Sequence, residues 1–202
     1  MKSKSIARLL AVSHTPAARL SLLGLLALTL GLRNAGAVDL FNFSVPNTAP
    51  WYDTGIDIAS GSQLAITATG IVQYGPLSAQ MADANGGDYT GTQFYPDSVL
   101  PTTTVVSLIG KIGGTTAMGT GTLLPEGKPG NGPGFVGTSY NLPVFFSGRL
   151  FLGYNDLVSA FGDNSGSFSV TLSVTPVPEP STAALAAIGL LALGRRLAPR
   201  RK

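Results

Sequence analysis

Cysteine is absent from this chain of 202 residues, and its one histidine, His14, lies within the first 37 positions. Without cysteine there is neither a disulfide nor a thiolate metal site. If the N-terminal segment is removed, as its pattern indicates below, the remaining chain also lacks histidine. A Ser-His-Asp triad, a Cys-His nucleophile and the usual zinc ligands are then excluded. A hard cation held by oxygen ligands remains possible.

Charged residues are scarce as well, at 11% of the chain, and the net charge of +3 is a property of the two ends. Five of the thirteen basic residues lie in the first 37 positions and five more in the last eight. Between them, residues 38–175 carry three basic and nine acidic side chains, a net charge of −6. A nucleic-acid partner requires clustered Lys and Arg on the folded part, so none is predicted.

The N-terminus has the pattern of a secretory signal peptide. Basic residues precede the apolar run LSLLGLLALTLGL at 20–32, and Ala-Gly-Ala follows at 35–37 as a small-residue cleavage site. The alternative is a membrane anchor, but about 13 apolar residues are short for a span of some 20. We predict a signal peptide over 1–37 that is cleaved before Val38.

The C-terminus joins three features within 176–202. Three prolines at 176, 178 and 180 make an extended linker, an apolar run fills 183–194, and an arginine pair with a basic tail follows. As a helix the run would reach about 18 Å, against an apolar bilayer core of about 30 Å. The basic tail would hold its end in the cytoplasm. An ordinary tail anchor is the alternative.

This order of motif, short apolar helix and arginine cluster closely resembles the PEP-CTERM sorting signal, with Pro178, Glu179 and Pro180 as its motif. The resemblance implies an exosortase in an exopolysaccharide-producing Gram-negative bacterium. It also implies that the protein is anchored in the inner membrane through its C-terminal helix. Cleavage near Pro178–Pro180 would then release it or attach it at the cell surface or in the extracellular matrix.

Residues 38–175 have the size of one domain and the pattern of a β-protein. In SQLAITATG, Leu64, Ile66 and Ala68 share one face, and SFSVTLSV near the end of the domain alternates in the same way with Ser and Thr outward. Further strand material lies at 104–113 and 143–154, and PEGKPGNGPG (125–134) reads as a loop. Short strands between turn signals predict an all-β, antiparallel β-sandwich, a jelly roll or related topology.

Two carboxylates and an amide gather in the loop before the last strand, and we expect that loop to join neighbouring strands. Asp156, Asp163 and Asn164 fall within nine positions, and Gly162 and Gly166 allow the turns that could aim them at one point. Carboxylates held close repel each other, and a divalent cation between them removes that cost. Such turns are also a natural source of calcium ligands. The alternative is that these side chains only make turn hydrogen bonds.

Three segments in this order resemble the bacterial LecA-like, galactose-binding lectins. They are the strand that ends Gln73-Tyr74-Gly75-Pro76, the stretch Leu108–Gly113, and Tyr154-Asn155-Asp156 followed by Gly-Asp-Asn-Ser-Gly-Ser-Phe-Ser-Val. The resemblance implies a calcium ion. Its ligands would be the carbonyls of Tyr74 and Ala160 and the side-chain oxygens of Asp156, Asp163 and Asn164. The ion would coordinate two vicinal sugar hydroxyls, with Asp156 and Asp163 accepting hydrogen bonds from them.

The chain departs from that family at the sugar-binding positions. Position 163 is Asp where the family often has Asn, and the segment after Tyr74 lacks the histidine and the glutamine next to it that contact sugar in the family. Asp83, Asn85 and Asp88 could line the site instead, or form a solvated turn. The departures put galactose specificity in doubt more than they do the calcium site.

The sequence thus predicts an exported carbohydrate-binding protein that uses calcium, with a galactose-type sugar or exopolysaccharide as its partner. The alternative is a structural biofilm or matrix β-sandwich that binds no sugar. An enzyme such as a two-carboxylate glycosidase needs one acid of raised pKa. As ligands of one ion, Asp156 and Asp163 would both stay ionised, so we predict no catalytic activity.

Overall fold

Strands make up nearly all the regular structure of the described residues, which are 37–88, 90–114, 120–176 and 188–189 of a computed structural model. In chain order they are β1 (Asp39–Pro46), β2 (Trp51–Ile58), β3 (Gln63–Thr69), β4 (Val72–Gln73), β5 (Met81–Ala82), β6 (Leu108–Ile112), β7 (Thr122–Leu123), β8 (Ser139–Pro143), β9 (Gly148–Tyr154) and β10 (Ser167–Thr175). Within these residues no helix is long and apolar enough to cross a membrane.

The predicted terminal segments fall almost entirely outside the described residues. Of the signal peptide, 1–37, only residue 37 is described. Of the sorting signal, 176–202, only residues 176, 188 and 189 are described, so the motif Pro178-Glu179-Pro180 is not. Both segments therefore stay predictions at the structural level.

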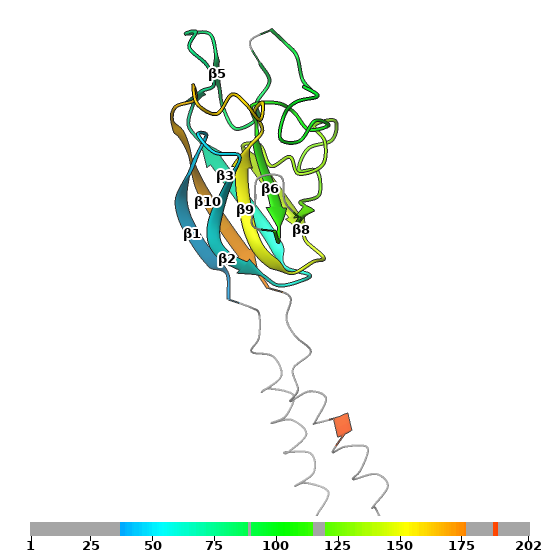
Figure 1. The fold of residues 1–202 in the computed structure, drawn as a ribbon. Helices are drawn as coiled ribbons and strands as arrows, with labels where there is room; N and C mark the ends of the chain where they lie inside the picture. Colours follow the sequence, from blue (N-terminus) through cyan, green and yellow to red (C-terminus); the bar gives the residue numbers. More distant parts are fainter. Residues whose placement is uncertain (1–36, 89, 115–119, 177–187, 190–202) are drawn as a thin grey trace, which may run out of the picture. The chain divides into compact units, whose positions relative to one another are not determined.

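The domain consists of two four-stranded antiparallel sheets. One has the order β1-β10-β3-β8 and the other β2-β9-β6-β7, while β4 and β5 form a short hairpin. Figure 1 shows β1, β10 and β3 in one layer and β2, β9 and β6 in the other. Eight strands divided in this order between two sheets form a jelly roll. The predicted all-β antiparallel sandwich is confirmed.

The alternation read from the sequence sets the inner face of the first sheet. In β10 the side chains of Phe168, Val170, Leu172 and Val174 are buried, and the Ser and Thr residues between them face outward. Leu172 lies opposite Ile66 of β3, so the two apolar rows coincide. Burial of such rows between the sheets stabilises the domain by about 25 cal/mol per Å² of apolar area.

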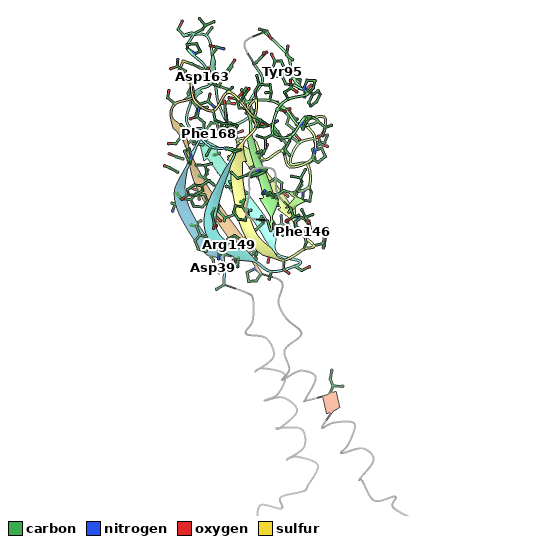
Figure 2. The ribbon with its side chains drawn as sticks, in the orientation of Figure 1. Asp39, Tyr95, Phe146, Arg149, Asp163 and Phe168 are labelled. Carbon is green, nitrogen blue, oxygen red and sulfur yellow. The ribbon has the colours of Figure 1, made fainter. Side chains whose placement is uncertain are left out.

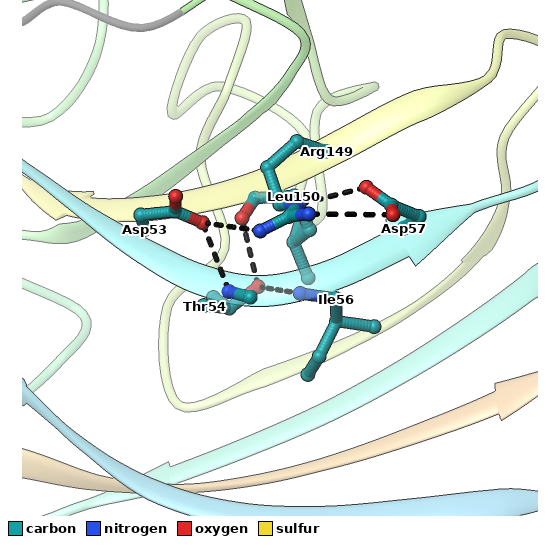
Figure 3. Close-up of polar contacts among 7 residues, drawn as sticks. Asp53, Thr54, Ile56, Asp57, Arg149 and Leu150 are labelled. Atoms are coloured by element: carbon teal, nitrogen blue, oxygen red, sulfur yellow. Dashed lines mark hydrogen bonds and ion pairs between the residues drawn. The ribbon is translucent and has the colours of Figure 1, made fainter.

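A bulge in β2 is bridged by the one arginine of the domain. The register of β2 against β9 shifts between Asp53 and Asp57, and Gly55 between them has φ of 75°, which glycine adopts readily. Arg149 of β9 donates to both carboxylates, from Nε to Asp57 at 2.7 Å and from a terminal nitrogen to Asp53 at 3.3 Å (Figure 3). This hydrogen bond from Arg149 lowers the pKa of Asp57. Two of the acidic residues are thereby engaged in strand pairing.

The strand predicted at 104–113 is shorter than expected, because β6 begins only at Leu108. Asn155, which is fully buried, donates from Nδ2 to the carbonyls of Thr103 (2.8 Å) and Thr104 (3.0 Å). Val106 has φ of 54°, outside the β-region. Backbone carbonyls that a side chain occupies in this way are not available for a strand ladder.

The loop between β9 and β10 crosses from the second sheet to the first, so the expectation that it joins neighbouring strands is wrong. The reason is the jelly-roll topology, which places β9 in one sheet and β10 in the other. Figure 2 shows Asp163 of this loop at one end of the domain and Asp39 and Arg149 at the opposite end. Because Asp39 pairs with Val174, the chain enters and leaves the domain at the end away from the loop.

Candidate metal and ligand site

Asp156 and Asn164 stand at the two ends of the loop and are in direct contact. Asp156 follows β9 almost at once and is 4% exposed, while Asn164 comes shortly before β10 and is 8% exposed. Nδ2 of Asn164 donates to Oδ2 of Asp156 at 2.8 Å, and the backbone N–H of Leu157 donates to Oδ1 at 2.7 Å. The predicted convergence of these two side chains is observed, in a buried setting.

The orientation of the Asn164 amide is fixed by two acceptors. Besides the Asp156 carboxylate, Nδ2 donates to the backbone carbonyl of Asn47 at 2.9 Å. A flipped amide would place its oxygen against a carboxylate oxygen and a carbonyl oxygen, neither of which can donate. Oδ1 of Asn164 therefore has to lie on the other side, and there it is buried with no hydrogen-bond partner.

Tyr74 is brought to this loop by the strand that precedes it. Gln73 and Ser165 exchange two backbone hydrogen bonds, of 3.0 and 2.9 Å, in an isolated antiparallel bridge. Tyr74 is the next residue after Gln73, and its own N–H donates to the Gln80 carbonyl at 2.9 Å. Although Tyr74 and Asn164 are far apart in the sequence, the bridge puts them beside each other.

Ala160 and Asp163 lie in the middle of the same loop. The N–H of Asp163 donates to the Ala160 carbonyl at 3.4 Å, which closes a turn. Asp163 is exposed, and its charge acts on its buried neighbour. Burial raises the pKa of Asp156, hydrogen bonds from Asn164 and Leu157 lower it, and the charge of Asp163 raises it again, with a net upward shift.

A second acidic loop, between β5 and β6, lies alongside the loop between β9 and β10. The N–H of Val99 donates to the Asp156 carbonyl at 3.0 Å, and Val158 donates to the Asp97 carbonyl at 3.0 Å. Within this second loop, the sequence left open whether Asp83, Asn85 and Asp88 line the site or form a turn. In the structure the two carboxylates bind groups of their own loop, and Asn85 also binds Thr138, as the following contacts show.

Asp83 and Asn85 are engaged in turn and anchoring hydrogen bonds. The N–H of Asn85 donates to the Asp83 carboxylate at 2.8 Å, as in an Asx turn. Oδ1 of Asn85 accepts from the N–H and the hydroxyl of Thr138, at 3.2 and 3.1 Å. The carboxylate of Asp88 accepts from Thr90, Thr92 and Tyr95. These contacts favour the turn interpretation.

The donor set around Asp156 fits a hard cation. Ionised Asp156 is penalised by burial, and Oδ1 of Asn164 is a buried oxygen that accepts nothing. An unpaired buried acceptor costs roughly 1–3 kcal/mol, and an oxygen-seeking cation would relieve both penalties. No group of three or more His, Cys, Asp and Glu side chains gathers in the described part of the chain. A cation here would therefore rely on two carboxylates, an amide oxygen and backbone carbonyls.

Sequence reasoning missed Asn47, which contacts two parts of this site. It is fully buried directly after β1, its Nδ2 donates to the Gln73 carbonyl at 2.8 Å, and its own carbonyl accepts from Asn164. No spacing rule links position 47 to position 164. The residue becomes visible only when the fold brings β1, β4 and the loop together.

Comparison with known proteins gave matches for both parts of the chain. The model of the PA-IL-like protein family matches residues 44–176, and the model of the PEP-CTERM protein-sorting motif matches residues 176–201. The comparison with curated proteins found no match.

Two solved structures show some similarity. One is the EclA N-terminal domain, a PllA-like lectin, at 21% identity and a TM-score of 0.44, over 67% of this chain and 97% of that one. Another is IMPa from Pseudomonas aeruginosa in complex with an O-glycopeptide, at 15% identity and a TM-score of 0.26, over 80% of this chain but 16% of that one.

Proposed function

The chain belongs to the PA-IL-like protein family, and from that premise we propose that its β-sandwich binds carbohydrate through a calcium ion and is sorted to the cell surface. The ion would be held by the carbonyls of Tyr74 and Ala160 and by the side chains of Asp156, Asp163 and Asn164. The sugar would be of galactose type or part of an exopolysaccharide.

The observation that carries this proposal is the pair Asp156–Asn164. Its hydrogen bond turns the Asn164 oxygen away from every protein donor, while the carboxylate is kept out of water. The absence of a partner for a buried oxygen beside a buried carboxylate is what a cation site requires.

In this mechanism the protein binds and orients a sugar and breaks no bond. Calcium, when bound, would offer open coordination positions that two vicinal hydroxyls can take in place of water. Asp156, which is buried, would bind the ion on the side that faces the protein interior. Asp163, being exposed, can accept a hydrogen bond from a sugar hydroxyl as well as contribute charge. Both carboxylates act ionised, which suits binding rather than acid catalysis.

The sorting motif that matches residues 176–201 supports the second half of the proposal. An exosortase would cut near Pro178, Glu179 and Pro180, after the C-terminal apolar segment has held the protein in the inner membrane. The cleaved domain would then reside at the cell surface or in the extracellular matrix. The last strand ends at Thr175, at the end of the domain away from Asp163 (Figure 2). A domain attached through that end would present the loop outward.

Calcium titration followed by a glycan array tests the function. Isothermal titration of the full chain, stripped with EDTA, should show one calcium ion bound. The array should show sugar binding with calcium and none with EDTA, among galactose-type sugars or exopolysaccharide fragments. Calcium binding without any sugar would favour a structural matrix protein that keeps the lectin fold. No calcium binding would overturn the proposal.

A further inference from the structure

Asn47 is a fully buried amide that contacts two parts of the proposed cation site. Its Nδ2 donates to the Gln73 carbonyl at 2.8 Å, and its backbone carbonyl accepts from Nδ2 of Asn164 at 2.9 Å. Its N–H donates to the Gly166 carbonyl at 3.4 Å. One residue at the end of β1 therefore touches the strand that leads to Tyr74 and the loop that holds Asn164.

We propose that Asn47 is a positioning residue of the cation site. This inference rests on the proposed function, because it assigns Asn47 a role in calcium affinity. The side chain of Asn47 holds the Gln73 carbonyl, and with it the backbone that continues into the Tyr74 carbonyl. The main-chain carbonyl of Asn47 holds the Asn164 amide in the orientation that leaves its Oδ1 available to a cation.

The hydrogen bonds around Gln73 show why the side chain matters for geometry. The Gln73 carbonyl accepts from both Nδ2 of Asn47 and the N–H of Ser165, at 2.8 and 2.9 Å. A carbonyl has two lone pairs, so these two donors fix its direction. Without Asn47 the Gln73 carbonyl keeps only the Ser165 donor, while the N–H of the same peptide still donates to the Gln80 carbonyl, so the peptide is held by one bond fewer. The Tyr74 carbonyl, a predicted ligand in the next peptide, would then be positioned less rigidly relative to Asn164.

A purely structural role does not account for Asn47 well. Oδ1 of Asn47 is buried with no hydrogen-bond partner, so the residue leaves one acceptor unsatisfied. Asn155 offers the contrast, because its Oδ1 accepts from the N–H of Leu100 at 2.7 Å and its Nδ2 donates to several carbonyls. A buried amide with an unsatisfied oxygen is a costly way to close a loop. Such a cost is explained if Asn47 positions the residues that bind a ligand.

The test replaces Asn47 by Leu, which has a similar size and no polar atoms, and by Ala, which leaves room for water. Calcium Kd is measured by isothermal titration on the full chain, well below the melting temperature of each variant. Loss of a residue that orients metal ligands typically costs 10–100-fold in affinity. We expect a weakening of roughly 10–100-fold in both variants. Hydrogen exchange in EDTA should also show faster exchange of the Gln73 and Ser165 amides than in the wild type.

Val144→Ala is the matched control for lost stability. Val144 is fully buried and follows β8, at the end of the domain where Figure 2 labels Phe146. Its truncation should lower Tm and leave calcium Kd within about twofold, since it lies after β8 at the end of the domain away from Asp163. If Asn47→Leu and Asn47→Ala lower Tm but keep the wild-type Kd, as Val144→Ala does, Asn47 is a structural residue and the inference is overturned. A wild type that binds no calcium would instead overturn the proposed function, and the inference with it.

Discussion

Two carboxylates at the same end of the domain have opposite surroundings. Asp88 accepts hydrogen bonds from the N–H groups of Thr90 and Thr92, at 3.0 and 2.8 Å, and from the Tyr95 hydroxyl. Burial raises the pKa of Asp88, but these hydrogen bonds outweigh it and the pKa is lowered. The carboxylate of Asp88 is thus satisfied by the loop that carries it, and its negative charge is stabilised by that loop.

Asp156 has fewer donors and a deeper position. It accepts from Leu157 and Asn164, while burial and the charge of Asp163 raise its pKa. Its charged form is therefore disfavoured by the protein alone. The comparison teaches that the presence of acids in a turn-rich loop does not by itself mark a cation site. The proposed cation site at Asp156 rests instead on a carboxylate whose charge the protein compensates incompletely, beside an oxygen with no hydrogen-bond donor.

The largest effect on calcium affinity should appear when Asp156 and Asp88 are mutated separately and compared. Asp156→Ala removes a direct ligand of the proposed ion, so calcium Kd should weaken by more than the roughly 100-fold upper range for supporting residues. Asp88→Asn should leave calcium Kd within about twofold while lowering Tm, because it weakens the Tyr95 and Thr90 hydrogen bonds. Isothermal titration and thermal melts measure both quantities. Equal losses of calcium affinity in the two variants would remove the distinction between the loops.

The dependence of stability on pH should differ in sign between the two residues. The raised pKa of Asp156 means that its contribution to stability is present below its unfolded-state value and is lost as pH rises through its folded-state pKa. The lowered pKa of Asp88 gives stability that is present above its unfolded-state value and lost as pH falls through its folded-state pKa.

Melting curves in EDTA between about pH 3 and 8, spanning the unfolded-state carboxyl pKa of about 3.9, measure these contributions. Asp156→Ala should remove a decline of Tm toward neutral pH, and Asp88→Asn should reduce the loss of Tm at the acidic end. Adding calcium at neutral pH should restore the wild-type Tm without affecting Asp156→Ala. An unchanged pH profile in Asp156→Ala would show that burial does not disfavour its charge.

The sequence was sufficient for the fold and for the convergence of two candidate site residues, for physical reasons. In β3 and β10 alternate side chains are buried, because one face of the sheet packs on the core. The alternation of apolar and polar residues can therefore be read from a single sequence. Asp156 and Asn164 are eight positions apart in one loop, and local turns bring them together. Asn47 could not be found in this way, because its role depends on the jelly-roll topology that places the end of β1 beside β4.

The same limit explains the errors along the chain, which include the strand material expected at 143–154, where β8 ends at Pro143 and β9 begins at Gly148. The start of β6 was placed four residues too early, since Val106 has strand propensity but the Asn155 side chain takes the neighbouring carbonyls. The loop from β9 to β10 was expected to join neighbours, although the two strands lie in different sheets. Both features depend on contacts between distant segments, which local patterns do not record.

Among the variants that change the proposed cation site, Asp163→Asn should have the smallest effect on calcium affinity. Asp163→Asn keeps the shape of an exposed ligand and removes one charge, so it should weaken calcium binding without abolishing it. A charge pair near the protein surface is worth about 1–4 kcal/mol before solvent screening, and exposure favours the lower figure. We therefore expect a loss of about fivefold in calcium affinity. Because the charge of Asp163 raises the pKa of Asp156, the variant should also show a weaker decline of Tm toward neutral pH in EDTA.

Gln63→Ala, which changes the exposed amide pair with Asn141, serves as the control and should alter neither quantity. A loss in Asp163→Asn as large as that in Asp156→Ala would mean that the exposed carboxylate, not the buried one, dominates the site.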